Sequence, residues 1–154
     1  MNNIYFLNES ILFNKNKELS KKCISKNVDK NIDVNIFSTL EKIFTITIRQ
    51  DIKSFLIENS GGYPIKDTFI VDGDDYEVRA FLSLDDANKY YNIKKPLDFF
   101  MKKTNKKIIP IGIDSGDNYY CVNNETGKVY YWSTDENSYF CISNSLNNFM
   151  SLFK

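Results

Sequence analysis

Hydrophobic residues first recur at helical spacing after residue 33. Either Asp33 or Asn35 can cap a helix with one apolar face, formed by Ile36, Leu40, Ile43 and Phe44. A second helix is predicted from about Arg49, with a buried stripe of Ile52, Phe55 and Leu56. We expect this second helix to end at Asn59.

Two adjacent glycines follow the second helix. The segment ENSGGYP occupies positions 58 to 64, although the whole chain contains only six glycines. Gly61 or Gly62 can adopt the left-handed conformation that ends helices, in which a residue with a β-carbon is strained. One of the two glycines is therefore predicted to stop the helix.

Beyond Pro64 the hydrophobic period changes from helical to alternating. The segments TFIVDG and YEVRAFLSL are predicted to be strands joined by the acidic turn DGDD. One face of the second strand is expected to carry Val78, Ala80 and Leu82. The opposite face is expected to carry Glu77, Arg79 and Phe81.

The remaining pattern predicts further helices around a meander of strands. Asp85 can cap a short helical stretch, and Pro96 fits the first turn of a helix whose inward residues are Leu97, Phe100 and Met101. Four strands follow, KIIPIGI, NYYCVN, KVYYWS and SYFCI, with NETG as the tightest turn. A closing helix is expected to bear Leu146, Phe149, Met150 and Phe153. Helices at both ends of a largely antiparallel sheet indicate an α+β fold.

The first 32 residues are the least patterned part of the chain. IYFL and ILF can pair as a short hairpin, or ILF can open a helix that runs through NKELSKKC. We interpret residues 1–32 as an N-terminal extension and residues 33–154 as the core of a single domain, 1–154. No internal repeat, linker or change of composition marks a second domain.

The composition excludes several classes of protein. The start lacks a basic segment before an apolar stretch, and no apolar run approaches the roughly 18–20 residues of a membrane helix, so we expect neither secretion nor membrane spanning. The three cysteines are far apart and predict a cytoplasmic protein with reduced thiols at Cys23, Cys121 and Cys141. Histidine is absent, which removes the commonest general base and every triad that depends on it.

Charge is segregated along the chain although the net charge is zero. From 67 to 86 there is one base, Arg79, against seven acids: Asp67, Asp72, Asp74, Asp75, Glu77, Asp85 and Asp86. From 94 to 107 there are six lysines against Asp98 alone. Such patches influence the choice of partner more than the fold. A solvated face or loop is the alternative interpretation of each run.

No segment has the pattern of a metal or phosphate site. The acidic run DGDDYE lacks the glycine at the sixth position of an EF-hand loop, and Ser83 stands at the twelfth position. The segment GIDSGDN joins two predicted strands, so it lacks the helix N-terminus that a phosphate-binding loop requires. We therefore expect no metal, no other cofactor and no small-molecule substrate.

Aromatic residues are frequent in the last strands. Tyr119 and Tyr120 are adjacent, so they point to opposite faces and predict one core residue and one surface residue. The same alternation applies to the run Tyr130, Tyr131 and Trp132. A nucleic-acid platform would need interleaved bases, but Lys128 stands alone against Asp114, Asp117, Glu125, Asp135 and Glu136. This balance argues against a nucleic-acid partner.

Taken in order, the segments DIKSFLIENSGGYP, IIPIGIDSGDNYYCVNNETGKVYYW and ISNSLNNFMSLF resemble the SUKH superfamily over about residues 33 to 154. That superfamily comprises bacterial toxin-immunity proteins and cell-wall-assembly regulators of the Smi and Knr type. Two details depart from its pattern. In the superfamily a helix ends in an Asn-Gly-Gly element, which Ser60 interrupts here. The segment TITIRQD also lacks the proline that often opens the second helix in the superfamily. The resemblance implies that the glycine pair allows close approach of backbones between helix and sheet.

The resemblance implies a non-enzymatic immunity protein that occludes the active site of a cognate bacterial toxin, for which a nuclease is the expected class. A basic nuclease cleft would favour a carboxylate-rich surface. The predicted partner-binding residues are Asp72, Asp74, Asp75, Tyr76, Glu77, Asp114 and Asp117, with Tyr76 as an exposed anchor. The alternative is a regulatory scaffold for protein interactions. An enzyme is the third hypothesis, limited to carboxylate chemistry.

Overall fold

The computed structural model describes residues 25–153, and the alternatives for IYFL and ILF lie outside them. The described chain begins with the short strand β1 (Ser25–Lys26), followed by the helices α2 (Ile36–Phe44) and α3 (Gln50–Asn59). Strand β1 pairs antiparallel with β2 (Tyr63–Pro64), which directly follows the glycine pair. The end of α3 at Asn59 confirms the boundary predicted from the sequence.

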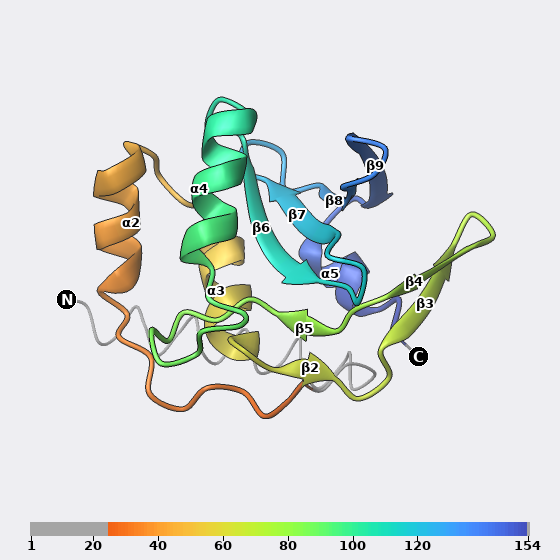
Figure 1. Ribbon diagram of the computed structural model, residues 1–154, viewed down its shortest axis with the longest axis horizontal. Helices are drawn as coiled ribbons and strands as arrows, with labels where there is room; N and C mark the ends of the chain where they lie inside the picture. The colour runs from red at the N-terminus through yellow and green to blue at the C-terminus, as the bar shows by residue number, and fades with distance from the viewer. Residues whose placement is uncertain (1–24, 154) are drawn as a thin grey trace.

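The predicted meander forms the centre of the molecule (Figure 1). Five strands lie in the order β5 to β9, and each neighbouring pair is antiparallel. Their bounds are Ala80–Phe81, Ile108–Ile113, Tyr119–Asn123, Val129–Ser133 and Ser138–Ser143. The α+β fold expected from the sequence is therefore confirmed.

A second, separate sheet is formed by β3 (Thr68–Val71) and β4 (Asp74–Glu77), which project from the body as a hairpin (Figure 1). The prediction of one continuous strand over YEVRAFLSL was wrong. The backbone N–H of Val78 donates to Asp67 in the hairpin, and the next N–H, of Arg79, donates to Ile113 in the central sheet. The chain thus changes its pairing partner between two consecutive residues.

Two of the helical predictions also need correction. In α2 the buried residues are Phe37 and Leu40, whereas Ile43, predicted on the buried face, is 65% exposed. The stretch capped by Asp85 is a single turn, in which its carboxylate accepts from the N–H of Ala87. Helix α4 (Lys94–Lys103) does bury the predicted Leu97, Phe100 and Met101.

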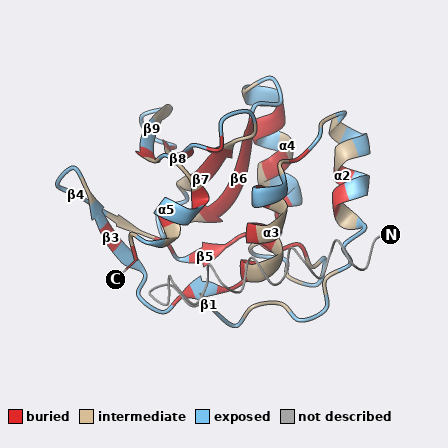
Figure 2. Ribbon diagram, turned by 180° about the vertical axis from the view of Figure 1, so that it is seen from behind, coloured by how far each residue is buried: buried red, intermediate tan, exposed pale blue. Residues whose placement is uncertain are grey.

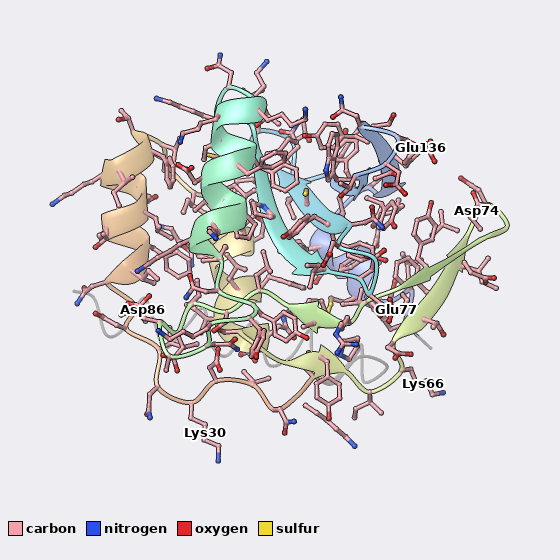
Figure 3. All side chains as sticks on the ribbon, viewed as in Figure 1. Lys30, Lys66, Asp74, Glu77, Asp86 and Glu136 are labelled. Carbon is pink, nitrogen blue, oxygen red and sulfur yellow. The ribbon has the colours of Figure 1, made fainter. Side chains whose placement is uncertain are left out.

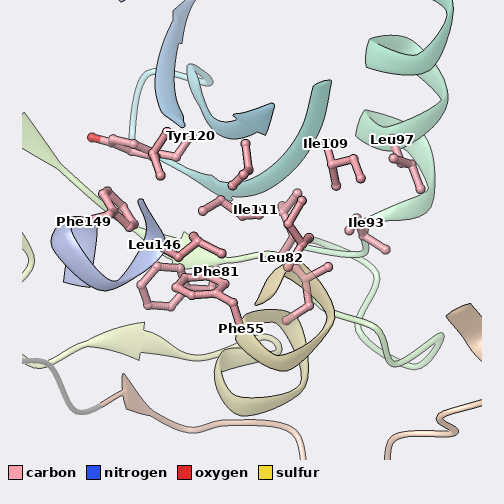
Figure 4. Packing of buried hydrophobic residues seen from close by; sticks show 14 of the residues in the cluster. Phe55, Phe81, Leu82, Ile93, Leu97, Ile109, Ile111, Tyr120, Leu146 and Phe149 are labelled. Atoms are coloured by element: carbon pink, nitrogen blue, oxygen red, sulfur yellow. The ribbon is translucent and has the colours of Figure 1, made fainter. Parts of the chain in front are cut away.

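The sheet is covered on both faces. Helix α4 lies beside β6 at the front of Figure 1, whereas Figure 2, which shows the molecule from behind, brings α3 and α5 (Leu146–Met150) forward. The larger core cluster joins α3 and α5 to the sheet, with Phe55, Phe81, Tyr120 and Phe149 in contact (Figure 4).

A smaller cluster occupies the other face of the sheet. Phe100 of α4 packs there with Ile108, Cys121 and Trp132. Of the adjacent pair, Tyr120 is fully buried in the larger cluster, and Tyr119 is half-buried in the smaller one, with its ring 5.5 Å from that of Phe100. Alternation along β7 correctly separates the two faces, but the second face is covered by a helix.

The glycine pair lies in the connection between α3 and β2. Gly61 has a φ of +69°, the left-handed conformation predicted for a helix stop. A β-carbon at Gly62 would lie 2.7 Å from the carbonyl oxygen of Lys26, and one at Gly61 would lie 2.5 Å from the carboxylate of Asp29. At Gly62 backbone approaches backbone, which confirms for this residue the role that the resemblance implied, whereas Gly61 is confined by a side chain.

Candidate functional site

The tip of the β3–β4 hairpin carries three exposed carboxylates. Asp72 and Gly73 form its two-residue turn with φ values of 52° and 83°. Positive φ at both turn residues matches the twist of the flanking strands. Asp72, Asp74 and Asp75 are exposed, and Figure 3 shows Asp74 at the far end of the hairpin. The predicted acidic turn therefore presents its charges to solvent on a projecting arm.

Tyr76, predicted as an exposed anchor, is half-buried at the base of the arm. Its ring stacks on Phe69 with centroids 5.4 Å apart and meets the ring of Tyr131 edge-on at 5.1 Å. Burial, followed by the negative charges of Asp74 and Asp72, raises the pKa of Tyr76. The residue fixes the arm to the body and leaves only part of its ring for a partner.

Glu77 joins the arm to the turn between β6 and β7. One carboxylate oxygen accepts from the backbone N–H of Ser115 at 2.9 Å, and the other accepts from the Ser115 hydroxyl at 2.6 Å. The backbone carbonyl of Glu77 also accepts from the buried Tyr120 hydroxyl at 2.6 Å. Both carboxylate oxygens already have donors, so this residue positions the arm.

Asp114 has a similar positioning role within the β6–β7 turn. One oxygen accepts from the backbone N–H groups of Gly116 and Asn118 at 2.9 and 2.8 Å. The other accepts from the hydroxyl of Tyr131 at 2.6 Å. Burial, and then this hydrogen bond to a carboxylate, raises the pKa of Tyr131. Asp114 is therefore held inside the turn, whereas Asp117 is exposed.

The β8–β9 turn adds two acids that the sequence reasoning did not assign to the site. Asp135 and Glu136 are exposed there. Thr134 fixes this turn to the β6–β7 turn, because its N–H donates to Asn118 and its hydroxyl donates to the carbonyl of Asp117, both at 2.8 Å. The signal was available in the meander, in which alternate turns lie at the same end of the sheet.

We call the exposed acids of these three turns the acidic turn surface: Asp72, Asp74, Asp75, Asp117, Asp135 and Glu136. Figure 3 shows Asp74 and Glu136 on the same side of the molecule. Segments 67–77, 113–119 and 133–138 contain no lysine or arginine. The surface therefore has the charge expected of a site for a basic partner.

Lysines gather elsewhere, on and after α4. Lys102 pairs with Asp98 at 2.9 Å, and the ammonium of Lys103 lies 5.0 Å from the centre of the Trp132 ring. Among residues 25–153 no group of three potential metal ligands comes together, and no helix has the length and apolar character needed to span a bilayer. The acidic turn surface is thus the more distinctive charged feature of the described chain.

A family model described as the SMI1 / KNR4 family (SUKH-1) matches residues 32–152. The chain belongs to this family. A curated protein of similar sequence is the SPbeta prophage-derived uncharacterized protein YokK of Bacillus subtilis (strain 168), which is 30% identical over 90 residues. The alignment includes 55% of this chain and 46% of YokK, so the chain spans about half the length of that protein.

A solved structure also resembles this SUKH-1 chain. It is a crystal structure of a protein from Pseudomonas syringae pv. tomato, with 18% sequence identity and a TM-score of 0.48. The match covers 78% of this chain and 83% of the other.

Proposed function

We propose that this SUKH-1 protein is an immunity protein that binds a cognate bacterial toxin in the cytoplasm and occludes its active site, without catalysing a reaction itself. The observation that carries the proposal is the acidic turn surface, built from three turns that hydrogen bonds hold together. Membership of the family supports a role in protein binding. A fold alone does not define a function, so the site must supply the rest.

The charge of the surface favours a nuclease as the toxin. A nuclease cleft is basic because its substrate is a polyanion, and carboxylates of an inhibitor can occupy the positions of phosphates. Asp72, Asp74, Asp75 and Asp117 are exposed and able to meet such a cleft. Glu77 and Asp114, whose carboxylates accept hydrogen bonds within the protein, would keep the turns in place.

The first test is growth of a sensitive host that expresses the gene adjacent to this one, with and without this protein. Killing that only co-expression relieves would support immunity. Toxicity that persists despite co-expression, or no toxicity at all, would reject the neighbouring product as the cognate toxin. Binding to cell-wall or signalling proteins would then favour the alternative, a regulatory scaffold for protein interactions.

The second test measures association of the purified pair at low and high salt. The double variant Asp72→Asn/Asp74→Asn removes two charges from the arm, and we expect association to slow about tenfold at low salt. High salt should remove this difference, because exposed charges are screened. Asp33→Asn/Glu125→Gln, which removes two charges outside the acidic turn surface, is the matched control. Equal association rates for the two variants would reject the assignment of the site.

A further inference from the structure

A groove of about 440 Å³ lies beside the base of the arm, outside the acidic turn surface. Three tyrosines line it: Tyr63 of β2, together with Tyr90 and Tyr91 of the loop before α4. Tyr90 is 92% exposed and Tyr63 is 38% exposed. Single exposed apolar residues are ordinary, but several large aromatic side chains around one groove are characteristic of binding surfaces.

The wall that carries Tyr90 and Tyr91 is fixed to Ser83, which follows β5. The backbone N–H of Ser83 donates to the carbonyl of Tyr91 at 2.6 Å, and the N–H of Tyr91 donates to the side chain of Asn88 at 3.1 Å. The amide of Asn92 donates to the carbonyl of Asp85 at 3.0 Å. A preorganised wall loses little conformational entropy when a ligand binds.

The charged groups in the groove select its ligand. Arg79 donates from Nε to the Tyr91 hydroxyl at 3.0 Å, which leaves its other guanidinium N–H groups for carbonyl acceptors of a ligand. Asp67 is exposed, and its carboxylate has no ion pair or hydrogen bond with a described residue. Asp67 and Glu77 against Arg79 give the lining a net charge of −1, which favours a cationic side chain.

We propose that this tyrosine groove, defined by Tyr63, Asp67, Arg79, Tyr90 and Tyr91, binds a basic polypeptide segment. A lysine or arginine side chain of that segment would lie against Tyr63 and Tyr90 and reach toward Asp67, while Arg79 donates to its backbone carbonyls. The proposal rests on the proposed function in assigning the segment to the toxin. In the complex with the toxin, the acidic turn surface would speed association of the two proteins, and the groove would slow their dissociation.

The groove can be tested without the toxin. Blocked tripeptides, N-acetyl-Gly-Arg-Gly-amide and N-acetyl-Gly-Glu-Gly-amide, are titrated into the full chain, and backbone amide signals are followed by NMR. We expect the arginine peptide alone to shift the signals of Tyr63, Asp67 and Tyr90. Tyr90→Ala should weaken its binding roughly fivefold. Shifts that avoid the groove, or equal binding of the glutamate peptide, would overturn the proposal.

Matched variants separate the groove from general effects of charge and ring exposure. Phe99→Ala removes another exposed ring, on α4, and Glu125→Gln removes an exposed acid in the β7–β8 turn. Neither variant should alter binding of the arginine peptide. If peptide binding is confirmed but the protein neutralises no toxin, the proposed function fails alone. If the protein neutralises a toxin but the peptide does not bind the groove, the groove proposal fails alone.

Discussion

Ser115 donates two hydrogen bonds to the carboxylate of Glu77, from its backbone nitrogen at 2.9 Å and from its hydroxyl at 2.6 Å. The two residues are 38 positions apart in the sequence. Ser115 lies in the turn between β6 and β7 of the central sheet, and Glu77 lies at the base of the projecting hairpin. This pair of bonds fixes the orientation of the acidic arm relative to the rest of the acidic turn surface.

Replacement of Ser115 by alanine should loosen the arm. The variant loses the hydroxyl bond, and because the site is exposed we expect the free energy of unfolding to fall by only about 1 kcal/mol. Amide hydrogen exchange in β3 and β4 should accelerate more than exchange in β7. Asp75→Asn, a change at an exposed neighbour, is the control. Unchanged exchange in the hairpin of Ser115→Ala would show that the aromatic contacts of Tyr76 alone hold the arm.

The glycine pair should tolerate no β-carbon. Gly62→Ala would place one 2.7 Å from the backbone oxygen of Lys26, and Gly61→Ala would combine positive φ with a clash against Asp29. We expect each change to reduce the free energy of unfolding by about 2 kcal/mol or more. Gly73→Ala is the matched control, because its φ of +83° is strained but nothing lies within 4 Å, so about 1 kcal/mol is expected. Chemical denaturation measures all three, and equal losses would contradict the packing argument.

Two tyrosine-to-phenylalanine changes should have different consequences. Tyr120 donates a 2.6 Å hydrogen bond to the carbonyl of Glu77, and its loss leaves a partly buried acceptor unpaired, at a cost of about 1–2 kcal/mol. The hydroxyl of Tyr139 is buried without a hydrogen-bond partner among the described residues. Tyr139→Phe should therefore leave stability unchanged or raise it slightly. Thermal unfolding at neutral pH compares the two, and a large loss in Tyr139→Phe would reveal a partner for this hydroxyl.

Alkaline pH should destabilise the protein through its buried tyrosines. Burial raises the pKa of Tyr139 to about 12 in the folded state, whereas an unfolded tyrosine ionises near pH 10. The folded state then binds more protons than the unfolded state between these values, so stability is full below about pH 10 and falls as pH rises toward 12. Burial also raises the pKa of Tyr120, with the same sign.

The measurement is the melting temperature at a series of pH values above neutrality. Tyr139→Phe removes one of the responsible groups, so its melting temperature should fall less steeply over this range than that of the parent protein. Identical slopes would indicate that Tyr139 ionises in the folded state at its ordinary pKa.

The site was predictable in part. The acids at 72–77 are adjacent in the sequence, and the DG turn that exposes them is a local signal. Asp114 and Asp117 have similar local patterns but different positions in the structure, since the hydroxyl of Tyr131 binds the first and leaves the second exposed. Part of this difference is local, because Asp114 also accepts from the backbone N–H groups of Gly116 and Asn118. The bond from Tyr131 has no local signal, because it comes from another strand. The contribution of Asp135 and Glu136 likewise depends on which turns lie together.

By itself, the sequence determined the helix over residues 50–59, the four strands of the meander and the left-handed glycine, because period and backbone preference act between near neighbours in the chain. Only the tertiary structure decided which side of α2 is buried, with Phe37 inside and Ile43 exposed. It also divided the strand YEVRAFLSL at Val78 and covered the second face of the sheet with α4. These outcomes depend on contacts between distant segments, where burial of apolar area and pairing of backbone groups outweigh local pattern.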